Sequence, residues 1–160
     1  PVPDNFTVEY KEAVIDNDSR TITIDITNTY HASKKYGGLT VEKEVTGIHG
    51  DKDKEFHFTV TLEDTTINGT YGDMKFKNGV AEITLKHGKK STATRLPAGI
   101  GYTIVEKEAN ADSYTTSATA DKGVIPENDN ADVKFINHKE VKPKKPDEPK
   151  ENPKTGNQIN

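Results

Sequence analysis

Three residues of this chain could together carry out one reaction: Lys43 supplies an amine, Asn137 a carboxamide and Glu106 an acid–base group. A neutral amine can attack the carbonyl carbon of a carboxamide, and a positioned carboxyl group can transfer the protons and assist the departure of ammonia. The product is an isopeptide bond between two side chains. Each chain can do this once only, so we expect self-modification and not an enzyme that turns over an external substrate.

The surrounding segments place all three side chains on the hydrophobic side of a strand. Side chains in a strand alternate between its two faces, so residues two apart share a face. Lys43 thereby shares a face with Leu39, Val41 and Val45. Glu106 shares a face with Tyr102 and Ile104, and Asn137 shares one with Val133 and Phe135. A polar group on a core face is costly unless it finds a partner. We therefore expect Lys43, Glu106 and Asn137 to meet inside the fold.

Each of these residues also has an ordinary structural interpretation. A lone inward lysine at a strand end usually extends to solvent, a lone glutamate is usually exposed or paired, and a lone asparagine usually belongs to a turn. The main alternative to the bond is a buried ion pair between Lys43 and Glu106. Burial favours the neutral forms of both groups, so transfer of one proton between them would produce the nucleophile and the acid together. Fixed geometry would supply much of the rate, since effective molarities of about 10⁵ M or more are possible.

The elements that must position these residues are predicted to be β-strands. Short alternating runs rich in Val, Ile, Thr, Tyr and Phe are separated by Gly, Asn, Asp and Pro, and two Asn-Gly pairs are typical of tight hairpins. We expect an all-β fold, an antiparallel β-sandwich. Helix is expected only as short segments, near residues 63–66 or 106–111. The expected strands cover residues 6–11, 21–29, 39–45, 55–62, 74–77, 80–85, 91–95, 101–106, 113–119 and 132–137.

Four parts of the chain differ in character. Residues 1–30 end in a strand whose apolar face closes with Asn28, much as the main domain closes with Asn137, and the two asparagines are 109 positions apart. We interpret residues 1–30 as a short β-hairpin, the last strands of a preceding, similar domain. The other predicted parts are a linker (31–38), the main domain (39–138) and an extended Pro-rich and Lys-rich spacer (139–160).

Composition argues against several classes of function. The 160 residues carry 22 basic and 26 acidic side chains, a net charge of −4 without a strong basic block, which argues against nucleic acid as a partner. Cysteine is absent, so neither disulfides nor thiolate metal sites can hold the fold. The five histidines lack metal-ligand spacing, and no phosphate loop or second nucleophile–base set is visible. We therefore expect no metal, no cofactor and no membrane span in this chain.

Four separated segments, matching in order, resemble the B-type (Cna B-like) domains of Gram-positive pilins and collagen adhesins. The resemblance covers residues 38–139 and rests on LTVEKEVTG, DKDKEFHFTVTL, RLPAGIGYTIVEKE and VKFINHK. It implies an immunoglobulin-like sandwich with an intramolecular isopeptide bond, in which Lys43 is the amine, Asn137 the acceptor and Glu106 the catalytic acid. It also implies a structural stalk domain of a cell-wall-anchored surface protein or pilin, outside a Gram-positive cell.

The tail carries a second resemblance, to the sorting signal that sortases recognise in Gram-positive wall proteins. The match consists of Asn152, Pro153, Lys154, Thr155 and Gly156, with Asn where Leu is commoner. The resemblance implies that a sortase cleaves after Thr155 and joins it to an amine of the peptidoglycan or of another pilus subunit. In this sequence neither a hydrophobic segment nor a basic tail follows Gly156.

Two other functions are compatible with the sequence. A ligand-binding adhesin module, recognising a host matrix protein such as collagen, would need an exposed aromatic or apolar patch, and the sequence shows no clear one. A polymerising pilin would need a lysine that accepts the next subunit, for which Lys34 and Lys35 are candidates through their exposure. A binding assay against matrix proteins would distinguish the adhesin module from a structural stalk.

Overall fold

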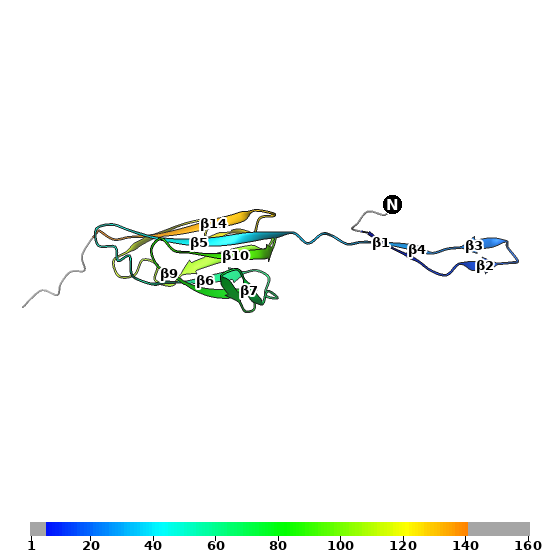
Figure 1. The fold of residues 1–160 in the computed structure, drawn as a ribbon, viewed down its shortest axis with the longest axis horizontal. Helices are drawn as coiled ribbons and strands as arrows, with labels where there is room; N and C mark the ends of the chain where they lie inside the picture. The colour runs from blue at the N-terminus through cyan, green and yellow to red at the C-terminus, as the bar shows by residue number, and fades with distance from the viewer. Residues whose placement is uncertain (1–5, 141–160) are drawn as a thin grey trace, which may run out of the picture.

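The computed structural model describes residues 6–140, which consist of β-strands joined by turns and connecting segments (Figure 1). The sorting-signal match at residues 152–156 and most of the predicted spacer lie outside this range. The strands that build the sandwich are β5 (Tyr36–Thr46), β6 (Phe56–Leu62), β7 (Gly69–Tyr71), β8 (Met74–Phe76), β9 (Val80–Leu85), β10 (Lys90–Pro97), β11 (Gly101–Glu106), β12 (Thr115–Thr119), β13 (Lys122–Val124) and β14 (Asn130–His138).

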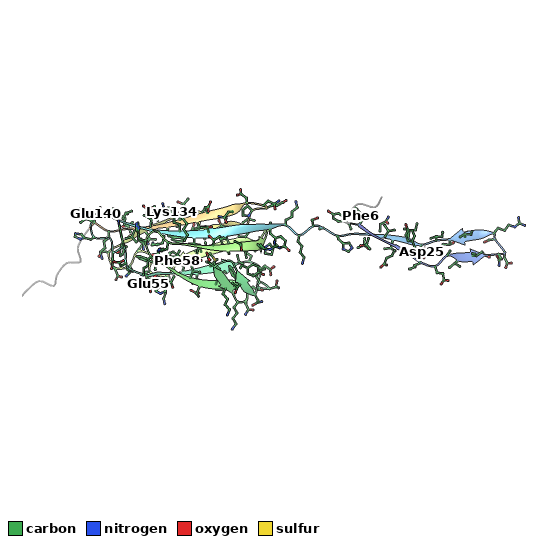
Figure 2. All side chains as sticks on the ribbon, in the orientation of Figure 1. Phe6, Asp25, Glu55, Phe58, Lys134 and Glu140 are labelled. Atoms are coloured by element: carbon green, nitrogen blue, oxygen red, sulfur yellow. The ribbon has the colours of Figure 1, made fainter. Side chains whose placement is uncertain are left out.

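Two four-stranded sheets face each other and enclose the core. One sheet has the strand order β10–β5–β14–β12 and the other β13–β11–β6–β9, while β7 and β8 form a separate small hairpin. Alternate residues of the long strands are buried; in β6 these are Phe56, Phe58, Val60 and Leu62. Phe58, which is labelled in Figure 2, lies in the sandwich. It packs edge-to-face on Phe135 of the opposite sheet, with ring centroids 5.1 Å apart. The predicted all-β sandwich is confirmed.

The first and last strands of the sandwich, β5 and β14, are hydrogen-bonded neighbours and run parallel to each other. In their register, Phe135 of β14 lies beside Lys43 of β5, and Asn137 lies beside Val45. The other strand pairs described in the two sheets are antiparallel, as predicted. Because β5 and β14 are parallel, the chain enters the sandwich at one end and leaves it at the other, where Glu140 lies (Figure 1, Figure 2).

β5 begins at Tyr36, earlier than the sequence indicated, so Gly37 and Gly38 belong to a strand and not to the predicted linker. A Cβ atom at Gly37 would lie 1.8 Å from the backbone oxygen of Pro126, and one at Gly38 would lie 2.3 Å from the side chain of Asn130. At Gly37 the neighbouring backbone approaches so closely that only glycine fits, whereas at Gly38 a larger residue would have to displace the Asn130 side chain. In a sequence, the same Gly-Gly pair is more typical of a connector.

The prediction of short helices near residues 63–66 and 106–111 is wrong, because both segments form turns. In the first, the carboxylate of Asp64 accepts hydrogen bonds from the backbone N–H and from the hydroxyl of Thr66, at 2.8 and 2.6 Å. Such side-chain hydrogen bonds compete with those of a helix. Within residues 6–140 no helix is long and apolar enough to cross a bilayer.

Residues 6–30 form a two-stranded ribbon that extends away from the sandwich (Figure 1). The side chains of Ile22, Ile24 and Ile26 in this ribbon are 64%, 54% and 56% exposed. A two-stranded hairpin buries little core of its own, and a row of isoleucines is typical of a face that packs against another element. The paired strands are β1 (Phe6–Tyr10) with β4 (Ile26–Tyr30), and β2 (Val14–Asp16) with β3 (Thr21–Thr23).

Candidate cross-link site

Two adjacent strands of one sheet and the end of a strand in the facing sheet bring three polar side chains together. Lys43 is on β5, Asn137 is near the end of β14, and Glu106 is the last residue of β11. Their exposed fractions are 0%, 0% and 3% in that order. The prediction that all three face the core is confirmed; Lys43 interrupts an apolar stripe, whereas Glu106 and Asn137 each end one.

One carboxyl group connects the amine to the amide. Nζ of Lys43 donates a hydrogen bond to Oε2 of Glu106 at 2.8 Å, and Nδ2 of Asn137 donates one to Oε1 at 2.5 Å. The buried ion pair that was the alternative to a cross-link is therefore present in this arrangement. It is also the state from which transfer of a proton to the carboxylate would start. An amine, a carboxamide and a carboxyl group thus share one hydrogen-bonded cluster.

The carbonyl oxygen of Asn137 is the unsatisfied atom of this cluster. Oδ1 is buried and accepts no hydrogen bond from the residues that the structure describes. An unsatisfied buried acceptor costs about 1–3 kcal/mol. A half-turn of the amide, which preserves its shape, would point Oδ1 at the carboxyl group, and a protonated Glu106 would then donate to it. In that orientation the acid would polarise the carbonyl group for attack.

Aromatic rings cover the amine and exclude water from it. Nζ of Lys43 lies 4.4 Å from the ring centroid of Phe56 and 5.8 Å from that of Phe58. This burial lowers the pKa of Lys43 below its ordinary value, although the hydrogen bond and charge of Glu106 and the charge of Glu108 raise it in part. The lower pKa makes the neutral, nucleophilic form of the amine easier to reach.

The loop between β9 and β10 fixes the backbone of β5 around the lysine. The N–H of Lys43 donates to the carbonyl of Lys89 at 3.0 Å, and the N–H of Gly88 donates to the carbonyl of Lys43 at 2.8 Å. Two residues along the strand, the N–H of Val45 donates to Nδ1 of His87 at 2.9 Å. Sequence reasoning missed His87, because a histidine in a polar turn gives no sign of which strand it will contact.

A second contact that the sequence did not reveal fixes the turn after Glu106. Oε2 of Glu108 accepts a hydrogen bond from the backbone N–H of His57 at 2.9 Å, and Oε1 lies 2.5 Å from Nδ1 of the same histidine. The N–H of Lys107 donates to the carbonyl of His57 at 2.9 Å. These contacts attach the end of β11, and therefore Glu106, to β6.

The lowered pKa of Lys43 predicts how an unreacted form of the chain responds to pH. In Glu106→Gln no cross-link is expected, and burial acts on Lys43 without the opposing carboxylate. Between the folded pKa of Lys43 and its unfolded value of about 10.4, the unfolded state binds more protons, so the free energy of unfolding should rise with pH. The slope approaches about 1.4 kcal/mol per pH unit. Urea denaturation at a series of pH values measures it.

The control for this prediction is the double variant Glu106→Gln/Lys43→Met, which lacks the titrating amine but keeps the other ionisable groups. The difference in slope between the two variants isolates Lys43. Equal slopes would contradict the interpretation that burial lowers the pKa of Lys43.

Comparison with known proteins identifies a family and several relatives of this chain. The family described as a domain of unknown function (DUF7601) matches residues 37–139, which include all three residues of the cluster. Two proteins of Streptococcus pyogenes are similar in sequence: the pilus tip adhesin Cpa is 34% identical over 120 residues, and a pilin of serotype M1 is 30% identical over 95 residues. These alignments cover 66% and 49% of this chain but 17% and 28% of the relatives. The chain therefore spans less than a third of their length.

A solved structure of the pilus-presented adhesin Cpa has a similar fold. It is 27% identical, covers 72% of this chain and 30% of its own, and superposes with a TM-score of 0.55. The homologues are thus streptococcal pilins and Cpa pilus adhesins, and they have pilin-like folds.

Proposed function

Because the chain belongs, through residues 37–139, to the DUF7601 domain family, and its homologues are pilin and pilus adhesin proteins, we propose that it is a structural stalk unit of a surface pilus. The unit stabilises itself by a covalent bond between Nζ of Lys43 and Cγ of Asn137. The observation that carries this proposal is the buried Glu106 carboxyl group, which binds both side chains at 2.8 and 2.5 Å.

The reaction begins with transfer of one proton from Lys43 to Glu106, which neutralises both groups in their water-excluded site. The free amine attacks Cγ of Asn137, while the protonated carboxyl group donates to Oδ1 and stabilises the negative charge that develops there. A proton from the attacking nitrogen passes through Glu106 to Nδ2, and the Cγ–Nδ2 bond breaks. One C–N bond forms, one C–N bond breaks and one ammonia leaves, so no oxidant or cofactor is needed.

The proposal also gives the chain a location and an attachment. Pilin and pilus adhesin homologues support display outside the cell, on a Gram-positive surface. A sortase would recognise residues 152–156 and join Thr155 to peptidoglycan or to another pilus subunit. Residues 1–30 would be the closing strands of a preceding domain, which the exposed isoleucine face of the ribbon supports.

Intact mass spectrometry of the full chain tests the proposed bond. The wild-type chain should be lighter than its sequence mass by one ammonia, and peptide mapping should find one branched peptide that joins β5 to β14. Lys43→Ala, Glu106→Ala and Asn137→Ala should each restore the full mass, because each removes one of the three participants.

Peptide mapping is essential to this experiment, since an Asn-Gly pair can also lose ammonia by closing a succinimide ring. The chain has such pairs at Asn68-Gly69 and Asn78-Gly79. Lys134→Ala serves as the control, because Lys134 is a partly exposed lysine of β14, outside the cluster, that should not affect the loss. A wild-type chain of full sequence mass would rule out the bond.

A further inference from the structure

A cavity of about 210 Å³ lies between the two sheets, beside the cluster. Ile104 and Glu106 line it from β11, and Phe135 lines it from β14. These strands belong to opposite sheets, so the cavity extends into the space where the two inner faces meet. The exposed residues Val105, Ala109 and Asn110 also line it, so it is an open pocket at the edge where the two sheets meet.

Small side chains of β12 leave this edge of the sandwich open. Thr116 is paired with Asn137, and Ala118 is paired with Phe135, so both lie on the face of β12 that is turned toward the other sheet. Both also line the cavity. Thr116 is half-buried and Ala118 is exposed, so these two small side chains leave this edge of the space between the sheets unfilled.

Glu106 belongs both to this cavity and to the hydrogen-bonded cluster. The side chains of Lys43 and Asn137 are fully buried, and the ring of Phe56 covers the amine of Lys43. Ammonia released at Cγ of Asn137 must leave this enclosed site. Of the three groups only Glu106 lines the cavity, and its side chain is fully buried, so the cavity opens at the sheet edge and ends against the cluster.

We propose that the cavity is the passage by which ammonia leaves the centre, and that it admits small primary amines along the same path. This inference rests on the cross-linking function proposed above. Asp121 also lines the cavity, and its carboxylate would attract the ammonium ion that ammonia becomes in water. The ligand class is therefore ammonia and primary amines of similar size.

A passage that lets ammonia out also allows a second reaction once the lysine is removed. In Lys43→Ala the amine is lost and a space is left beside Asn137 and Glu106. Methylamine that enters in its neutral form would attack Cγ of Asn137, with Glu106 again transferring the proton. One C–N bond forms to methylamine, the Cγ–Nδ2 bond breaks and ammonia leaves. The product is an N-methyl carboxamide at Asn137, heavier than the variant by one CH₂ group.

The experiment incubates folded, full-length Lys43→Ala with methylamine at mildly alkaline pH and follows the intact mass. Peptide mapping should place the added CH₂ on Asn137, and tert-butylamine, which is bulkier, should give no product. If Lys43→Ala does not fold, Lys43→Val retains more of the apolar packing of β5 and replaces it. Circular dichroism establishes folding before the amine is added.

A matched pair of substitutions in β12 tests the route itself. Ala118→Leu, added to Lys43→Ala, should fill the cavity. The reaction of Asn137 with methylamine should then be slower by about tenfold or more. Ser117→Leu is the control, because Ser117 is the neighbouring residue on the opposite face of β12 and does not line the cavity. It should leave the rate close to that of the parent variant.

The outcomes separate this inference from the proposed function. If the wild-type chain loses one ammonia but Lys43→Ala is never methylated, the passage is refuted and the cross-link stands. Methylation at the same rate with Ala118→Leu would also refute the passage. If the wild-type chain keeps its full mass, the proposed cross-link is refuted, and the passage that depends on it is refuted as well.

Discussion

When the wild-type chain is stretched from its two ends, we expect that the 94 residues following Lys43 up to Asn137 will not extend. In Lys43→Ala the same residues should unfold and extend. Force enters the sandwich at the start of β5 and leaves at the end of β14, because these neighbouring strands are parallel. A bond between their side chains carries that force directly. The released residues would add roughly 300 Å of length, at about 3.3–3.6 Å each. Single-molecule force spectroscopy of the full chain measures this difference as an unfolding step that is absent in the wild type.

The control for the stretching experiment is Lys134→Ala. Lys134 is on the same strand as Asn137, but it forms surface ion pairs with Glu42 and Glu44 and is not in the core (Figure 2). It should retain the restricted extension of the wild type. Full extension of the wild-type sandwich would contradict the prediction, and so would restricted extension of Lys43→Ala.

The second large effect expected from loss of the cross-link is a decrease in equilibrium stability. Closing a loop of 94 residues removes conformational entropy from the unfolded chain, and in the loop-closure model this stabilises the fold by about 4–5 kcal/mol. Lys43→Met is the suitable variant, because it fills a similar volume and leaves no buried ammonium. Its melting temperature should fall by roughly 20–35 °C, since about 1 kcal/mol corresponds to 4–8 °C in a domain of this size.

Urea denaturation distinguishes loss of the cross-link from ordinary loss of packing. Without the cross-link the unfolded chain is more expanded, so Lys43→Met should show a steeper dependence of the free energy of unfolding on urea than the wild type. Lys134→Met, which alters a partly exposed lysine outside the core, should keep the slope of the wild type and a midpoint close to it. Equal slopes and midpoints in the wild type and Lys43→Met would contradict the prediction.

The polar members of the site could be predicted because strand alternation is a local property of the chain. Lys43 follows Leu39 and Val41 on one face of its strand, whatever that strand pairs with. The same reasoning placed Glu106 and Asn137 inside. Their residue types suggested the reaction and the family resemblance implied the same roles, and these remain predictions until the mass of the chain is measured.

Other features depend on contacts between distant segments and could not be predicted from local patterns. The parallel pairing of β5 with β14 joins strands from opposite ends of the domain, and no periodicity within either strand specifies its neighbour. Strands β7 and β13 are each three residues long and half-buried at most, so they lack an alternation to detect. The hydrogen bond from Val45 to His87 depends on how the loop between β9 and β10 folds back.

The carboxyl group that binds both reacting side chains comes from the sheet opposite to theirs. Lys43 and Asn137 become neighbours as soon as β5 and β14 pair, but the acid arrives only when the second sheet has docked. The cross-link would therefore form only after folding is complete. A chain in which the two sheets have not docked would lack the cross-link and would remain susceptible to proteases. Only fully folded subunits would then persist in a fibre.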